Sequence, residues 1–76
     1  MVVNIKLTGL LAASCGFREK RFDFPNDFTI ADAMEYIKVP VSGSWTRSSV
    51  NGSLKQKTYV LQDGDELFLF PIGGGG

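Results

Sequence analysis

The sequence predicts one small domain of the α+β class, in which one main helix packs on one face of a mixed β-sheet. Three observations support this prediction. The chain has 76 residues, a length that typically forms one domain with a thin core. Short runs of alternating or continuous apolar residues occur near both ends, as expected for strands. One segment between them carries apolar residues at helical spacing.

The first third of the chain predicts two strands. Residues 2–8 alternate between apolar and polar, which is typical of a half-buried strand, with one face made of Val3, Ile5 and Leu7. Residues 17–24 predict a second strand, with Phe22 and Phe24 facing inward, and it stops at the turn residues 25–27. Residues 9–16 between them are mostly small and predict a connection that contains a short helical turn at most.

The helix signal covers residues 29–40. Thr29 is the expected N-cap, and Asp32 stands three residues later, close to a capping box. Pro40 cannot continue a helix. One apolar stripe at positions i, i+3, i+4 and i+7 is made of Ile30, Ala33, Met34 and Ile37. We expect this stripe to pack on the apolar faces of the first and last strands, Val3, Ile5, Leu7, Leu67 and Leu69.

The second half predicts shorter elements. Residues 41–45 form a loop and residues 47–50 a strand, and Asn51-Gly52 then predicts a type I′ hairpin turn, which needs positive φ at both central residues. Residues 59–61 predict a brief strand or a turn. Residues 62–66, QDGDE, predict a turn in which Gly64 supplies positive φ. The final strand is predicted over residues 66–71.

The final strand is apolar on both faces, because Leu67 and Leu69 alternate with Phe68 and Phe70. A strand buried on both sides has this pattern, but one helix covers only one face. Two interpretations stay open. Phe68 and Phe70 pack under a loop, such as the one that holds Trp45, or they form an exposed patch for a partner.

Composition excludes several classes of function. Eight basic residues balance eight acidic ones, so no basic surface for nucleic acid is predicted. The absence of histidine excludes histidine-based triads and metal sites, and no metal site is predicted. The single cysteine, Cys15, cannot form an internal disulfide, which favours the reducing cytoplasm. We expect Cys15 to act as a small buried apolar side chain.

No segment reaches the apolar length of a membrane span, so no membrane partner is predicted. Residues 9–16, GLLAASCG, are similar to a bacterial lipoprotein cleavage box ending at Cys15. Asn4, Lys6 and Thr8 interrupt the apolar run that a signal peptide needs, and this disfavours that alternative.

The chain closes on four glycines, Gly73 to Gly76. Glycine has no side chain to pack and loses more conformational entropy on folding than any other residue. We therefore expect a folded domain over residues 1–72 and a flexible tail over residues 73–76. Either the tail is inert, or the backbone terminus is itself the functional part.

Two segments carry a family resemblance. VNG at residues 50–52 and LQDGDELFLFPIGGGG at residues 61–76 resemble the ending of the MoaD/ThiS family of ubiquitin-like sulfur carriers. This family comprises the small subunit of molybdopterin synthase and the thiazole-synthesis sulfur carrier. The resemblance is specific over the last third of the chain. It implies the ubiquitin-like β-grasp fold for the whole chain.

The resemblance also implies a mechanism in which the chain is a carrier, not an enzyme. In this family an E1-like adenylating enzyme uses ATP to join AMP to the terminal glycine, here Gly76. A sulfur donor then displaces AMP and leaves a thiocarboxylate. The carrier keeps no bound cofactor. The glycines before it, Gly73, Gly74 and Gly75, would thread the enzyme's channel, and the expected partner-binding residues are Phe68, Phe70, Pro71 and Ile72.

The branch of the family stays open. The molybdopterin branch usually has a longer helix with an arginine between its first two strands, which residues 9–17 lack. FPIG at residues 70–73 is similar to that branch, whereas the short stretch before VNG is closer to the thiazole branch. The sulfur acceptor is therefore thiazole synthase or the large subunit of molybdopterin synthase. Two other functions stay open: a protein modifier conjugated through Gly76, and an interaction module with an inert tail.

Overall fold

The computed structural model describes residues 1–39 and 46–71. The predictions for the loop at 41–45, for Ile72 and for Gly73 to Gly76 fall outside these residues. The elements are β1 (Val2–Leu7), α1 (Gly9–Cys15), β2 (Glu19–Asp23), α2 (Ile30–Tyr36), β3 (Thr46–Val50), β4 (Ser53–Leu54) and β5 (Glu66–Pro71).

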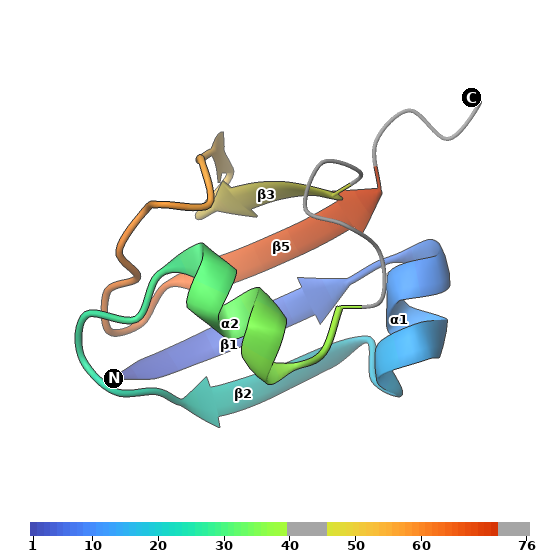
Figure 1. Cartoon of the computed structure of the whole chain (residues 1–76), viewed down its shortest axis with the longest axis horizontal. Coiled ribbons are helices and arrows are strands. Elements are labelled where there is room, and N and C mark those ends of the chain that lie inside the picture. The colour runs from blue at the N-terminus through green and yellow to red at the C-terminus, as the bar shows by residue number, and fades with distance from the viewer. Residues whose placement is uncertain (40–45, 72–76) are drawn as a thin grey trace.

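The strands form one five-stranded sheet in the order β2-β1-β5-β3-β4. β1 and β5 run parallel at its centre, and the other pairs are antiparallel. α2 crosses one face of the sheet, and α1 lies at the end where β1 stops (Figure 1). This mixed sheet with a main helix on one face is the ubiquitin-like β-grasp arrangement, so the predicted fold class is confirmed.

The core lies between α2 and the sheet, as the periodicities predict. Because side chains alternate along a strand, only every second residue of β1 and β5 faces α2. The predicted stripe of α2 joins these residues in one buried cluster. The cluster is made of Val3, Ile5, Leu7, Leu11, Phe24, Ile30, Ala33, Met34, Ile37, Val50, Leu61, Leu67 and Leu69.

α2 begins where the sequence predicts. The Thr29 hydroxyl accepts a hydrogen bond from the Asp32 backbone N–H at 3.1 Å, and the Asp32 carboxylate accepts one from the Thr29 N–H at 3.0 Å. These two bonds form a capping box. The helix ends at Tyr36, before Pro40, because Lys38 takes the left-handed conformation with φ 60°.

Residues 9–15 form a second helix, where the sequence predicted a connection with at most one turn. Leu11 is buried in the same core cluster as α2 and the sheet, and this packing stabilises the helix. Its N-cap Thr8 makes no side-chain hydrogen bond, so the usual start signal is missing. Gly16 ends it in the left-handed conformation and donates to the Ala12 carbonyl.

Candidate functional site

β5 is the strand that leads to the glycine tail, and it is held on both sides. Leu69 pairs with Leu7 of β1, while Phe70 and Pro71 pair with Arg47 and Thr46 of β3. β5 pairs with β1 over residues 66–69 and with β3 over residues 67–71, so its last two residues are paired on one side. A strand inside a sheet frays less than an edge strand. β5 therefore ends in a paired residue, Pro71, which is itself exposed, and in the sequence Ile72 alone stands between it and the four glycines.

Phe68 and Phe70 point away from α2, because Leu67 and Leu69 face it. Their rings lie side by side, with centroids 5.2 Å apart, and both side chains are half-buried. Both rings keep part of their surface exposed, and the choice between a partner-binding patch and packing under a loop stays open. Trp45, the proposed cover in the other interpretation, lies outside the described residues.

The residues next to these two rings extend the surface across the sheet. Phe68 pairs with Lys6 of β1 and with Ser49 of β3, and Ser49 pairs in turn with Leu54 of β4. Leu54 is 63% exposed. We call this surface the phenylalanine face and define it as Lys6, Arg47, Ser49, Leu54, Phe68 and Phe70.

The signature residues that carry the resemblance have a structural role that sequence reasoning missed. Asp65 is buried, and its carboxylate accepts hydrogen bonds from the Asn51 amide, the Tyr59 hydroxyl and the Gln62 backbone N–H. The Asn51 amide oxygen accepts from the Glu66 N–H. These bonds join the hairpin turn to the turn before β5. The left-handed conformation of Asn51, Gly52 and Gly64 confirms both predicted turns.

Cys15 is half-buried against the core, so the prediction of a buried apolar side chain holds in part. Burial raises the pKa of its thiol, so the thiol stays protonated at neutral pH. Among residues 1–39 and 46–71, no three cysteine or acidic side chains group as metal ligands. Within the same ranges, no helix has the length and hydropathy to cross a membrane.

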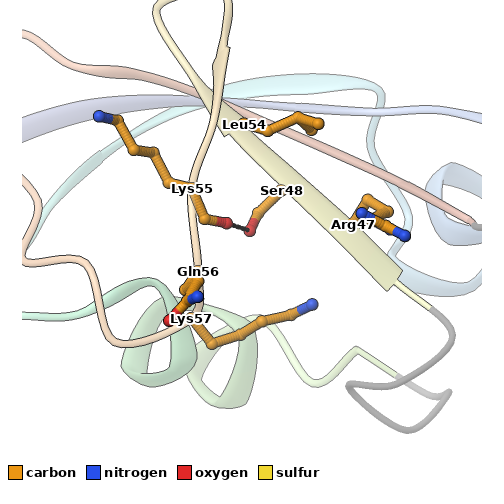
Figure 2. Close-up of a pocket in the computed structure, with 6 residues that line it drawn as sticks. All are labelled: Arg47, Ser48, Leu54, Lys55, Gln56 and Lys57. Atoms are coloured by element: carbon orange, nitrogen blue, oxygen red, sulfur yellow. Dashed lines mark hydrogen bonds between the residues drawn. The ribbon is translucent and has the colours of Figure 1, made fainter.

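A basic cleft beside the phenylalanine face was also missed. It is lined by Arg47, Ser48, Leu54, Lys55, Gln56 and Lys57 and has a volume of about 400 Å³ (Figure 2). One signal in the sequence could have indicated it. Residues 36–62 contain four of the eight basic side chains and none of the eight acidic ones.

Comparisons with known proteins give matches in structure. No family model matches the chain, and no curated protein is similar to it in sequence. Small archaeal modifier protein 1 of Haloferax volcanii superposes with a TM-score of 0.80 at 26% identity, over 100% of both chains. A putative molybdopterin converting factor subunit 1 of Pyrococcus furiosus has a TM-score of 0.81 at 24% identity, over 93% of this chain and 97% of that one.

A third match is to the complex of subunits 1 and 2 of the molybdopterin-converting factor from Helicobacter pylori. One chain of that complex has a TM-score of 0.68 at 16% identity, over 100% of both chains. At the lower identities the match describes the fold alone. Three observations agree on the fold of this chain. They are the order of the strands in the sheet, the signature at residues 50–52 and 61–76, and the matches that cover nearly the whole chain. The chain has the ubiquitin-like β-grasp fold, and the ending of its sequence resembles that of the MoaD/ThiS family.

Proposed function

We propose that the chain is a sulfur carrier, whose C-terminal Gly76 is adenylated and then converted to a thiocarboxylate that donates sulfur in cofactor biosynthesis. The observation that supports this most is the setting of β5. This strand is paired with β3 up to Pro71 and presents the half-buried Phe68 and Phe70 on the face away from α2, and in the sequence only Ile72 separates it from the glycines. A fixed strand and an apolar patch next to a side-chain-free terminus suit a partner that must position that terminus.

The chemistry needs an activating enzyme, because an ionised carboxylate is a poor electrophile at neutral pH. A carboxylate oxygen of Gly76 attacks the α-phosphorus of ATP, and pyrophosphate leaves. The acyl-adenylate carbonyl is then attacked by the sulfur donor, and AMP leaves. ATP is thus a substrate of the E1-like enzyme. The carrier supplies only the carboxylate and the surface by which it is held.

The phenylalanine face is the proposed docking surface for that enzyme, together with Pro71 at the end of β5 and Ile72, the next residue in the sequence. Paired aromatic rings supply a large contact area at low entropic cost. The sulfur acceptor, which is the large subunit of molybdopterin synthase or a thiazole synthase, would use the same face after activation. The Helicobacter pylori match, a complex of two converting-factor subunits, supports a docking role for this fold.

A second candidate is a protein modifier, conjugated through Gly76 to lysines of target proteins. The match over both full lengths to a small archaeal modifier protein favours it. Both functions begin with the same adenylation and diverge when the activated glycine meets sulfur or an amine. An interaction module with an inert tail is the remaining alternative.

Intact mass spectrometry after incubation with ATP, an adenylating enzyme and a sulfur source tests the proposal. We expect the mass gain of one oxygen-to-sulfur exchange at the C-terminus. Conjugates to other proteins in a lysate, without that exchange, would favour the modifier. An unchanged mass with every such enzyme would favour the inert module. Adding purified thiazole synthase or molybdopterin-synthase large subunit to the charged carrier then identifies the sulfur acceptor.

A further inference from the structure

The basic cleft brings two cations together at the start of β3. Lys57 is half-buried, and its ammonium group donates to the Thr46 carbonyl, while Arg47 is the next residue of β3. Figure 2 shows both side chains at the same end of the strand. Desolvation lowers the pKa of Lys57, and the nearby Arg47 charge lowers it further. The two cations therefore repel each other.

Lys55, the third basic residue, contributes less charge to this place. Its ammonium group lies 5.2 Å from the centre of the Tyr59 ring, and in Figure 2 it points away from Arg47. Its carbonyl accepts from the Ser48 hydroxyl at 2.8 Å, which ties the two walls of the cleft together. The hydrogen bond between Ser48 and Lys55 thus fixes the walls of the cleft, and Arg47 and Lys57 lie at one end of it.

Protection of a sheet edge explains only part of this arrangement. β4 pairs with β3 only at Ser49 and Val50, so the start of β3 is an open edge, and a lysine over an open edge discourages aggregation. That explains Lys57 over the Thr46 carbonyl. It does not explain Arg47 beside it, because two like charges at one place oppose each other. In the described residues no acidic side chain lies within ion-pair distance of either cation.

The cleft is continuous with the phenylalanine face. Leu54 and Arg47 belong to both surfaces, and Arg47 pairs across the sheet with Phe70. A protein seated on Phe68 and Phe70 therefore reaches the cleft without leaving the surface. An acidic side chain of that protein would remove the repulsion between the two cations and pair with both, an electrostatic complementarity that favours orientation and rapid association.

We propose that this cleft receives a carboxylate-bearing segment of the protein that docks on the phenylalanine face, with Arg47 and Lys57 pairing with its acidic side chains. This inference rests on the proposed function for the identity of that protein, the adenylating enzyme. The apolar rings would supply contact area, and the cationic pair would set the direction in which the partner lies across β3 and β5.

The first test uses the chain alone. Capped hexaglutamate, which has side-chain carboxylates and no free termini, is titrated into isotope-labelled protein at low salt and followed by NMR. We expect amide shifts confined to residues 47–48 and 54–57. Arg47→Gln and Lys57→Gln should each lower the affinity for the peptide by about three- to tenfold. Arg21→Gln, which removes an exposed arginine from the opposite edge of the sheet, is the matched control and should bind like the parent.

Three results of this titration would overturn the inference. These are shifts spread over all basic residues, equal weakening by Arg21→Gln, and tighter binding of inorganic phosphate than of the peptide at the same residues. The last would indicate a phosphate site. Because Lys57→Gln also removes the bond to the Thr46 carbonyl, Lys57→Arg is measured beside it. Lys57→Arg keeps the charge and should keep the peptide affinity.

The second test uses the adenylating enzyme. In ATP–pyrophosphate exchange, Arg47→Gln and Lys57→Gln should raise the KM for the carrier by about three- to tenfold, with kcat little changed. Added salt should reduce the difference in KM between each variant and the parent, because it screens the charges. If the parent is adenylated and these variants have the KM of Arg21→Gln, this inference fails while the proposed function stands. If the parent is not adenylated at all, the proposed function fails, and the titration alone decides the acidic-ligand site.

Discussion

Asp65 shows how one buried residue fixes the start of the strand that bears the tail. Its carboxylate accepts from Asn51, Tyr59 and Gln62, which come from three different places in the chain. A buried carboxylate is favourable only when its oxygens are paired in this way. The Asp63 carboxylate accepts a further hydrogen bond from the Val2 N–H at 2.7 Å. The DGDE signature thus joins β1, β5 and the hairpin.

Replacing Asp65 by alanine should lower the free energy of unfolding by about 2–3 kcal/mol, because three donors in partly buried hydrogen bonds lose their acceptor. Urea unfolding followed by circular dichroism measures this change. Glu35→Ala, on the exposed side of α2, is the control and should stay within about 0.5 kcal/mol of the parent. Equal midpoints for the two variants would contradict the structural role of Asp65.

Tyr59 predicts an alkaline dependence of stability. Burial, the charge of Asp65 and their hydrogen bond raise the pKa of Tyr59 above its usual 10.0, while the Lys55 ammonium group faces the ring from the other side. The folded state therefore holds this proton more tightly than the unfolded state. The resulting stabilisation is present below pH 10 and is lost as the pH rises through the folded-state pKa.

Tyr59→Phe should remove this dependence. Thermal melting of the parent and the variant is compared from neutral pH to beyond pH 10. The difference between them should shrink as the pH rises, because only the parent has a phenol to ionise. Tyr36→Phe, which changes an exposed tyrosine on α2, is the control. A difference that stays constant over the whole range would contradict the link to Asp65.

At the scale of elements, strict patterns in the sequence predicted most of the fold. The final strand is found at residues 66–71 as predicted, and β1 is one residue shorter than predicted. α2 was predictable because its cap and its stripe agree. α1 was not, because its N-cap makes no side-chain bond and only Leu11 is buried. β4 has two residues and no periodicity of its own.

The candidate site was predictable only where it is local in sequence. The two faces of β5 follow from alternation, so the placement of Phe68 and Phe70 on the face opposite Leu67 and Leu69 could be foreseen. The surplus of basic residues over residues 36–62 could also be read from the sequence. The lining of the basic cleft and the Asp65 bonds could not, because they join residues that meet only after the hairpin folds. Asn51 and Asp65 are fourteen positions apart. Arg47 and Lys57 lie on two sides of the same hairpin.

The outer face of β5 makes a prediction of its own. Phe68→Ser and Phe70→Ser should weaken binding to the adenylating enzyme, measured by isothermal titration, with a smaller effect on stability than a core change. The Phe68 and Phe70 side chains are half-buried, so each serine variant should lose some free energy of unfolding. The loss should be smaller than that of Leu69→Ala, which leaves a cavity in the core and should cost about 2–5 kcal/mol. Unfolded Phe68→Ser and Phe70→Ser proteins would show that these rings are core residues instead.

At the scale of the whole molecule, the two ends of the described chain are separated. β1 and β5 run parallel, so Val2 begins at the end of the sheet where β5 starts, and Pro71 lies at the other end (Figure 1). The Met1 amino group is held by the Phe24 carbonyl at 2.7 Å, far from the site. The phenylalanine face and the basic cleft instead both reach the exit of β5, because Arg47 pairs with Phe70 and Lys57 is bonded to the Thr46 carbonyl opposite Pro71. One partner can therefore contact all three.

The last prediction separates this site from the glycines that follow it. Deleting Gly75 and Gly76 draws the carboxylate back by about 7 Å, out of reach of an ATP site shaped for the full chain. Gly75→Val keeps the length and restricts the backbone. Both variants should melt like the parent, because no described core side chain is removed, and both should bind the enzyme through the unchanged phenylalanine face. Both should lose AMP transfer in ATP–pyrophosphate exchange. The variants would thus keep binding to the enzyme while losing adenylation. Full adenylation of the truncated chain would contradict the carrier function and leave the interaction module with an inert tail as the better explanation.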